Sequence, residues 1–143
     1  MTAAVAAPEL ARGVLRLLDG LGYYGITEFS LSNGRRADVI ALDDRGQVAI
    51  VEIKSCWQDY ASDGKWPEYR AFCDRFYFAV GASFPRERLP EDAGLIVADR
   101  FGGAVLRPSA VLALPAARRR ALTLRLARVA LTRWRLGTEA AGA

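Results

Sequence analysis

The two segments that decide the fold are GRRADVIAL (residues 34–42) and QVAIVEIKS (residues 47–55). Both are rich in β-branched and apolar residues, which is typical of β-strands. The polar stretch between them ends in a glycine, and this composition indicates a hairpin whose loop is residues 44–46. We therefore predict two adjacent antiparallel strands over residues 36–43 and 47–55.

Three charged residues interrupt these apolar strands. The three-residue loop places Asp38 directly opposite Glu52, and Lys54 lies two residues beyond Glu52 on the same face of the sheet. Residues 48–51 and Ile53 are apolar, which predicts a sheet covered on both faces, where an unpaired charge is costly to bury. Two carboxylates this close repel each other unless a cation lies between them. A solvated cluster of ion pairs is the alternative, but the pattern favours a functional site.

The same three side chains suit metal-assisted hydrolysis. Asp38 and Glu52 provide hard oxygen ligands of the kind that Mg²⁺ or Mn²⁺ prefers, and the backbone carbonyl of Ile53 is a further candidate ligand. A bound divalent ion lowers the pKa of its water and neutralises charge that develops on a phosphate. Lys54 is placed to orient that water or to stabilise the transition state. We predict a catalytic set of Asp38, Glu52 and Lys54, with a metal held by Asp38, Glu52 and Ile53.

Composition narrows the alternatives. The 143 residues include no histidine, which excludes histidine-ligated zinc and any catalytic triad that uses histidine. Residues 101–143 contain eight arginines and one glutamate, whereas residues 1–100 have an excess of acids, and this segregation suggests a polyanionic partner. The chain shows neither a secretion signal nor an apolar run of membrane-spanning length, so we expect a cytoplasmic protein without membrane contact.

A family resemblance follows from these residues. Asp38, a spacer and then Glu52-Ile53-Lys54 resemble the active-site motif of the PD-(D/E)XK nuclease superfamily, with Ala37 in the place of its proline. A longer set of stretches resembles the MmcB family of bacterial DNA-repair endonucleases: residues 34–38, 51–55, 63–69 and 73–80. The resemblance covers roughly residues 10 to 135. It implies a role in DNA repair and a metal-dependent nuclease fold.

The order of the predicted elements matches the core of that superfamily. A crossover helix opened by Pro67 should make the strand that follows it parallel to the strand over residues 47–55. We predict an α/β fold, a restriction-endonuclease-like α/β/α sandwich around a central mixed sheet, in one domain over residues 9–136 with flexible ends at 1–8 and 137–143. The predicted helices are residues 9–21, 67–74 and 115–136, and the further strands are residues 26–32, 76–81, 94–99 and 104–107.

Four other residues are candidates for binding the substrate. Arg35 and Arg36 lie at the entrance of a strand, where they would contact a phosphate. Lys65 and Tyr69 are four residues apart and share a helix face near the end of the motif. For the two arginines the alternative is a solvated turn, and for Tyr69 the alternative is packing in the core.

The identity of a third acid is open. A two-residue turn at Asn33-Gly34 would pair Glu28 with Val39 and direct Glu28 away from the site, although a single bulge would reverse its direction. Glu9, at the start of the first helix, is the other candidate. A charge at a helix N-terminus is its ordinary explanation.

The sequence thus predicts a Mg²⁺- or Mn²⁺-dependent DNA endonuclease that acts in bacterial DNA repair. The alternative is a non-catalytic module on the same fold that binds DNA or another repair protein. Hydrolysis of RNA also stays open, because no element distinguishes the sugar. The arginines of the last helix are candidates for binding phosphates or form a solvated face. The two apolar stripes of that helix leave a homodimer open.

Overall fold

The structure, a computed structural model, describes residues 4–61 and 64–142 of the chain. The elements follow in the order α1 (Ala7–Gly20), β1 (Tyr24–Ser30), β2 (Arg36–Leu42), β3 (Val48–Ile53), α2 (Trp57–Ala61), η1 (Trp66–Phe72), β4 (Arg75–Val80), η2 (Arg86–Arg88), β5 (Gly94–Asp99), β6 (Gly102–Arg107) and α3 (Ala116–Gly142).

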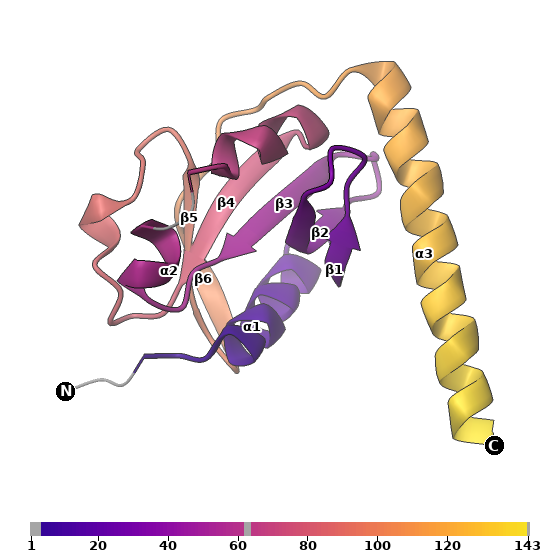
Figure 1. Cartoon of the computed structure of the whole chain (residues 1–143), viewed down its shortest axis with the longest axis horizontal. Coiled ribbons are helices and arrows are strands. Elements are labelled where there is room, and N and C mark those ends of the chain that lie inside the picture. Colours follow the sequence, from indigo (N-terminus) through magenta and orange to yellow (C-terminus); the bar gives the residue numbers. More distant parts are fainter. Residues whose placement is uncertain (1–3, 62–63, 143) are drawn as a thin grey trace.

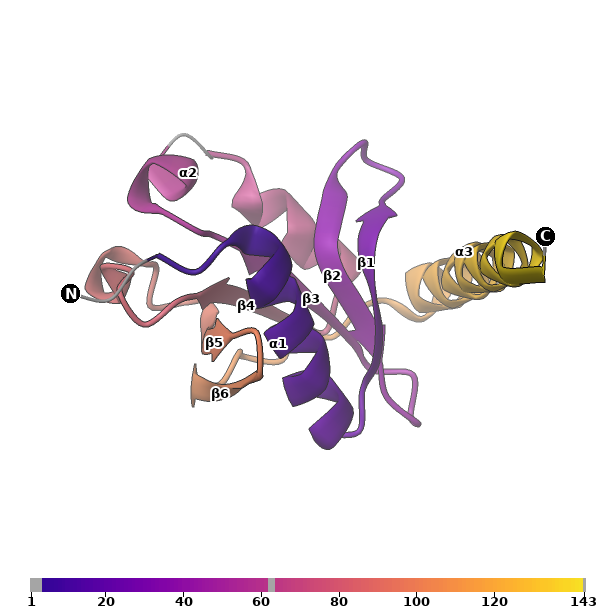
Figure 2. The ribbon, with the colours of Figure 1, turned by 90° about the horizontal axis from the view of Figure 1, so that it is seen from below.

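The six strands form one mixed sheet in which each strand lies next to its sequence neighbours. Strands β1 to β3 form an antiparallel meander, β4 and β5 continue parallel to β3, and β6 returns antiparallel. Helix α1 packs on one face, while η1, α2 and the first half of α3 pack on the other (Figure 1, Figure 2). The predicted α/β/α sandwich and the parallel fourth strand are confirmed.

Two apolar clusters hold these layers together. On the α1 face, Leu10, Val14 and Leu18 are at most 2% exposed and pack against the sheet. Helix α1 lies so close to the sheet that a Cβ atom added at Gly13 would stand 1.7 Å from the carbonyl oxygen of Asp99. The opposite cluster is rich in aromatic rings from β4, η1 and α2.

A buried ion pair fastens α3 to the rest of the domain. Asp74, which is 1% exposed, accepts two hydrogen bonds from the Arg119 guanidinium at 2.6 and 2.7 Å. It also accepts the backbone N–H groups of Val48 and Leu114. Burial alone would raise the pKa of Asp74, but these four hydrogen bonds lower it below its ordinary value. The carboxylate thereby joins β3, β4, the segment before α3 and α3 itself.

Several predicted boundaries differ from the structure. Helix α1 begins at Ala7, two residues earlier than predicted, and residues 1–3 of the predicted flexible end lie outside the described part. The segment after β3, predicted to be irregular, contains α2, and η1 is a 3₁₀ helix that ends at Phe72. Helix α3 continues to Gly142, although a flexible tail was predicted from residue 137, because its second half is rich in strong helix formers. Among the described helices, none is both long and apolar enough to cross a membrane.

The turn between β1 and β2 also differs from the prediction. The Leu31 N–H donates to the Arg35 carbonyl at 2.7 Å, so the loop has three residues, Ser32 to Gly34, and not two. Gly34 takes the left-handed conformation, with φ of +85°, and the Asn33 side chain accepts the Arg35 N–H. This combination is typical of a three-residue hairpin loop. The change shifts the pairing of β1 with β2 by one residue.

Candidate functional site

The β2–β3 hairpin has the predicted register. Its loop ends in Gly46 with φ of +78°, and Val39 lies opposite Val51. The next position in the same register places Asp38 opposite Glu52, as the sequence predicts. The two acids therefore come from neighbouring strands at the point where the hairpin opens toward the end of β3.

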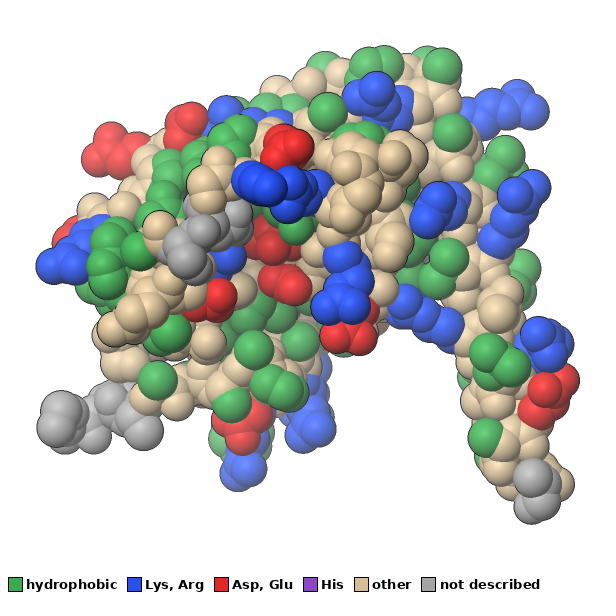
Figure 3. Space-filling view, in the orientation of Figure 1, with side chains coloured by type: hydrophobic (Ala, Val, Ile, Leu, Met, Phe, Trp, Pro, Cys, Tyr) green, Lys and Arg blue, Asp and Glu red, His purple; other side chains and the backbone are tan. Residues whose placement is uncertain are grey.

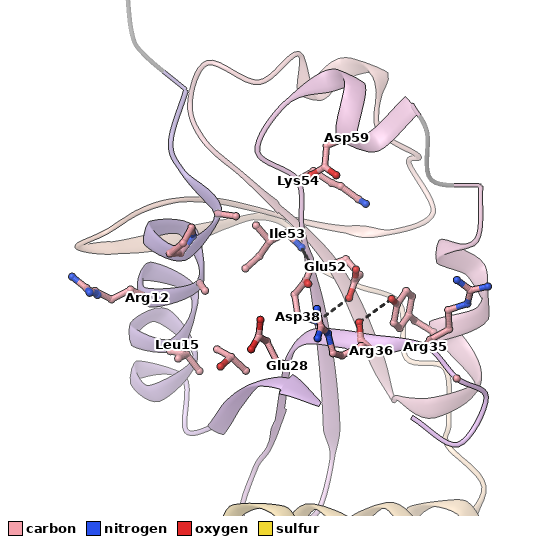
Figure 4. Close-up of a pocket in the computed structure, with 16 residues that line it drawn as sticks. Arg12, Leu15, Glu28, Arg35, Arg36, Asp38, Glu52, Ile53, Lys54 and Asp59 are labelled. Carbon is pink, nitrogen blue, oxygen red and sulfur yellow. Dashed lines mark hydrogen bonds between the residues drawn. The ribbon is translucent and has the colours of Figure 1, made fainter. Parts of the chain in front are cut away.

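Each carboxyl group is tied to the backbone of the other strand. The Asp38 N–H donates to Glu52 Oε1 at 3.0 Å, and the Ile53 N–H donates to Asp38 Oδ2 at 2.8 Å (Figure 4). Because each side chain accepts a backbone N–H of the opposite strand, the two carboxyl groups are held next to each other.

Much of the surface of the acid pair and of Lys54 is buried. Glu52 is 4% exposed and Lys54 is 6% exposed, while Asp38 is half-buried. Burial raises the pKa of Asp38, and burial together with the neighbouring Asp38 charge raises the pKa of Glu52 to about 9. The Lys54 N–H donates to the carbonyl of Ala79 at 3.0 Å, which fixes this residue against β4. A cation beside the pair lowers both pKa values, as the Lys54 charge already does in part, and so opposes the effect of burial.

These side chains line an open cavity of about 810 Å³. Its walls come from the start of α1, the β1–β2 hairpin and the end of β3, and Figure 3 shows acidic side chains inside this hollow. The charged residues among its lining are Arg12, Glu28, Arg35, Arg36, Asp38, Glu52, Lys54 and Asp59. The cavity is therefore open to solvent and lined by charged groups of both signs around the acid pair.

Glu28 lies in a different place from the one that the predicted turn implies. The observed register puts it opposite Asp38 and not opposite Val39, and it lines the cavity. Its φ of +53° is unusual for a residue other than glycine. Arg133 of α3 donates to the carbonyl oxygens of Glu28 and Thr27 at 2.7 and 2.6 Å. Among the described residues, however, no three acids, cysteines or histidines lie close enough together to hold a metal ion.

The other predicted residues divide into two groups. Arg35 and Arg36 line the cavity, as does Tyr69, whose hydroxyl donates to the Arg36 carbonyl at 3.0 Å. Lys65 and Glu9 are exposed and are not among the residues that line it. The structure thus brings the two arginines and the tyrosine to the acid pair, and it leaves the lysine and the first-helix acid outside the cavity.

Two charged residues of the cavity have no clear signal in the sequence. Arg12 lies on the polar side of α1, where a solvated arginine is ordinary. Asp59 lies in α2, five residues beyond Lys54, and the short helix that brings it back over the site was not predicted. Only the packing of α1 and α2 against the sheet places these two at the cavity.

The donor set of the pair fits a hard divalent ion. Two carboxylates converge in a site where their charges repel, and Ile53 lines the same cavity as a source of a carbonyl oxygen. Oxygen ligands of this kind are those that Mg²⁺ and Mn²⁺ select, with water completing the coordination. An ion there would offset the repulsion between the two carboxylates.

Comparison with known proteins gives a consistent assignment. A family model described as "DNA repair protein MmcB-like" matches residues 3–141. A solved structure from Silicibacter pomeroyi, titled SPO1766 protein of unknown function, is 35% identical with a TM-score of 0.92, and the match covers 96% of this chain and 94% of that one. The comparison with curated proteins found no match. The chain belongs to the MmcB-like family of DNA repair proteins.

Proposed function

We propose that this protein is a divalent-metal-dependent DNA endonuclease that acts in repair. The observation that supports the proposal most strongly is the convergence of Asp38 and Glu52, from opposite positions of two strands, beside a nearly buried Lys54. Carboxylates are rarely buried next to each other for stability, because the arrangement raises the pKa of both groups. The adjoining cavity gives a substrate access to the pair.

The residues have separate tasks in this proposal. Asp38, Glu52 and the Ile53 carbonyl hold Mg²⁺ or Mn²⁺, which when bound supplies an acidic water and neutralises charge on the phosphate. Lys54 orients the water and stabilises the negative charge of the transition state, since its ammonium is shielded from bulk solvent. Arg35 and Arg36 hold the phosphate at the cavity wall, where a guanidinium matches phosphate geometry.

A cleavage assay tests the proposal, and variants of the two lysines of the chain serve as a matched pair in it. Labelled single-stranded, duplex, flap and junction DNA would be incubated with Mn²⁺ and with EDTA. The Lys54→Met variant keeps the apolar stem but lacks the ammonium, so it should lose cleavage. The Lys65→Met variant makes the same change outside the cavity and should retain it at saturating DNA. Cleavage by Lys54→Met, or by the wild-type protein in EDTA, would contradict the proposal.

The second candidate is a module that binds DNA or another repair protein without cutting. It is favoured by the two backbone hydrogen bonds that the acid pair accepts without a metal. It is also favoured by the lack, among the described residues, of any group of three acids, cysteines or histidines that could hold a metal ion. Calorimetric titration with Mn²⁺ separates the two candidates. A nuclease should bind the ion at the pair and lose binding in Asp38→Asn, whereas a pure binder should give no heat in either protein.

A further inference from the structure

Helix α3 extends well beyond the surface on which it packs. It contains 27 residues, which corresponds to about 40 Å, yet Leu122 and Leu126 are its buried side chains. From residue 131 onward every described side chain of the helix is exposed. Figure 1 and Figure 2 show its second half projecting past the edge of the sheet. A helix of this length with so little core contact offers most of its surface to a partner.

Four of the seven arginines of α3 lie on one side of the helix. Arg118 and Arg125 are seven residues apart, as are Arg128 and Arg135, and three residues separate Arg125 from Arg128. Positions with these spacings lie on one side of a helix, two turns apart. We refer to these four residues as the arginine stripe. Glu139 is the single acid of α3, against seven arginines, and it pairs with Arg135 of the stripe at 2.9 Å.

The arginine stripe adjoins the β1–β2 hairpin. A groove of about 390 Å³ is lined by Leu31 and Ser32 of the hairpin and by Arg125 and Arg128 of the stripe. The next residues of the hairpin, residues 34–36, line the acid cavity. In Figure 3, basic side chains along α3 are visible on the same face of the molecule as the acid-lined hollow. One elongated ligand on this face would touch both.

The other side of α3 is fixed to the domain. Arg119 holds the buried Asp74 near the start of the helix, and Arg133 donates to the backbone carbonyls of Thr27 and Glu28 in the second half. These two anchors, together with the hydrogen bond of 2.9 Å that Arg118 of the stripe donates to the Ala71 carbonyl, set the rotation of the helix about its own axis. The arginine stripe is thereby held in a defined direction and does not depend on a ligand for its orientation.

We propose that the arginine stripe binds the phosphate backbone of duplex DNA and leads the duplex across the β1–β2 hairpin to the acid cavity. This inference rests on the proposed function for the role of the cavity, and it adds the surface that holds DNA outside it. A helix of about 40 Å matches roughly 12 base pairs of duplex. A second copy of the chain is a poor occupant of the stripe, because it would bring like charges together.

Fluorescence anisotropy with a labelled duplex of about 20 base pairs, measured in EDTA over a range of salt concentrations, tests the inference. The double variant Arg128→Gln/Arg135→Gln removes two charges from the stripe, and Gln keeps helix propensity. The control, Arg100→Gln/Arg120→Gln, makes the same change in charge elsewhere. Arg100 lies in the turn between β5 and β6, and Arg120 lies on another side of α3.

We expect the stripe variant to bind the duplex about tenfold more weakly near 0.1 M salt and its salt slope to fall by about 1.8, which is about 0.9 for each lost phosphate contact. The control should change neither value. Equal losses in both variants, or no loss in the stripe variant, would overturn the inference. The inference would also be overturned if the stripe variant lost the binding of the wild-type protein to anionic phosphatidylserine vesicles but bound duplex DNA as the wild-type protein does. It would likewise be overturned if light scattering showed a dimer of the wild-type protein and a monomer of the stripe variant.

The outcome is separable from that of the nuclease proposal. Binding in EDTA requires no metal and no cleavage, so stripe-dependent binding can be found in a protein that does not cut DNA. Conversely, a protein that cuts DNA with Mn²⁺ but binds it independently of the stripe would refute this inference alone. Circular dichroism of all variants should show unchanged helicity, since the altered side chains are exposed.

Discussion

Replacing Glu52 with Gln should stabilise the metal-free protein and abolish its stabilisation by Mn²⁺. Glu52 is 4% exposed, and burial with the adjacent Asp38 charge raises its pKa to about 9. In the unfolded chain the same group ionises near about 4.3, so folding near neutral pH must return a proton to it. Gln needs no proton, and its Oε1 can still accept the Asp38 N–H, which lies 3.0 Å from Glu52 Oε1.

The size of the effect follows from linkage. One pKa unit corresponds to about 1.4 kcal/mol, so the proton uptake costs on the order of 3 kcal/mol near pH 7. Removing that cost should raise the melting temperature by roughly 6 to 12 °C for a chain of this length. Because the folded-state pKa exceeds the unfolded one, wild-type stability should fall as the pH rises from about 4.3 through the folded-state value of about 9. The Gln variant should lack this contribution to the slope.

Scanning calorimetry of both proteins in EDTA and in Mn²⁺ would measure these quantities. Mn²⁺ at about 100 times its dissociation constant should stabilise the wild-type protein by about 2.7 kcal/mol and leave Glu52→Gln unchanged. Glu87→Gln, at an exposed position of η2, serves as the control and should stay within about 0.5 kcal/mol of the wild type. The reasoning is refuted if Glu52→Gln is less stable than the wild type in EDTA, or if Mn²⁺ stabilises both equally.

Three further predictions concern the scaffold. Asp74→Ala leaves Arg119 and two backbone N–H groups without their acceptor, so urea denaturation should show a loss of about 3–5 kcal/mol, against less than about 1 kcal/mol for the exposed Asp92→Ala. A similar loss in both would contradict the anchoring role. Because the folded-state pKa of Asp74 is lowered, its contribution should be complete above about pH 4, the unfolded-state value, and should be lost as the pH falls from there through the lower folded-state pKa. A stability gap between wild type and Asp74→Asn that persists in strong acid would oppose this. Gly13→Ala would place a Cβ atom 1.7 Å from the Asp99 carbonyl oxygen, so it should lower the free energy of unfolding by about 1–3 kcal/mol in the same assay. An unchanged urea midpoint would show that α1 does not pack closely against the end of β5.

Local signals were sufficient for the part of the site that lies on one hairpin. The loop that ends in Gly46 and the alternation of side chains set the register, so the opposition of Asp38 and Glu52 could be predicted before any tertiary contact was known. The resemblance to the MmcB family and the α/β/α order were confirmed for the same reason, since each depends on short stretches with strong strand or helix character.

Contacts between distant segments could not be predicted in the same way. The Asn33-Gly34 pair suits both a two-residue and a three-residue loop, and the choice between them moves Glu28 from one side of the sheet to the other. Asp74 and Arg119 are 45 residues apart and meet only because α3 returns to the start of β4. No periodicity in the sequence indicates such a pairing, because it depends on how the elements pack.

The most direct test of the metal site is anomalous diffraction from a crystal of this protein grown with Mn²⁺. We predict a single strong manganese peak about 2.1 Å from carboxylate oxygens of both Asp38 and Glu52. The peak should be lost in crystals of Glu52→Gln grown under the same conditions. A wild-type crystal with no manganese at the two carboxyl groups, or with a manganese ion bound elsewhere, would contradict the metal site.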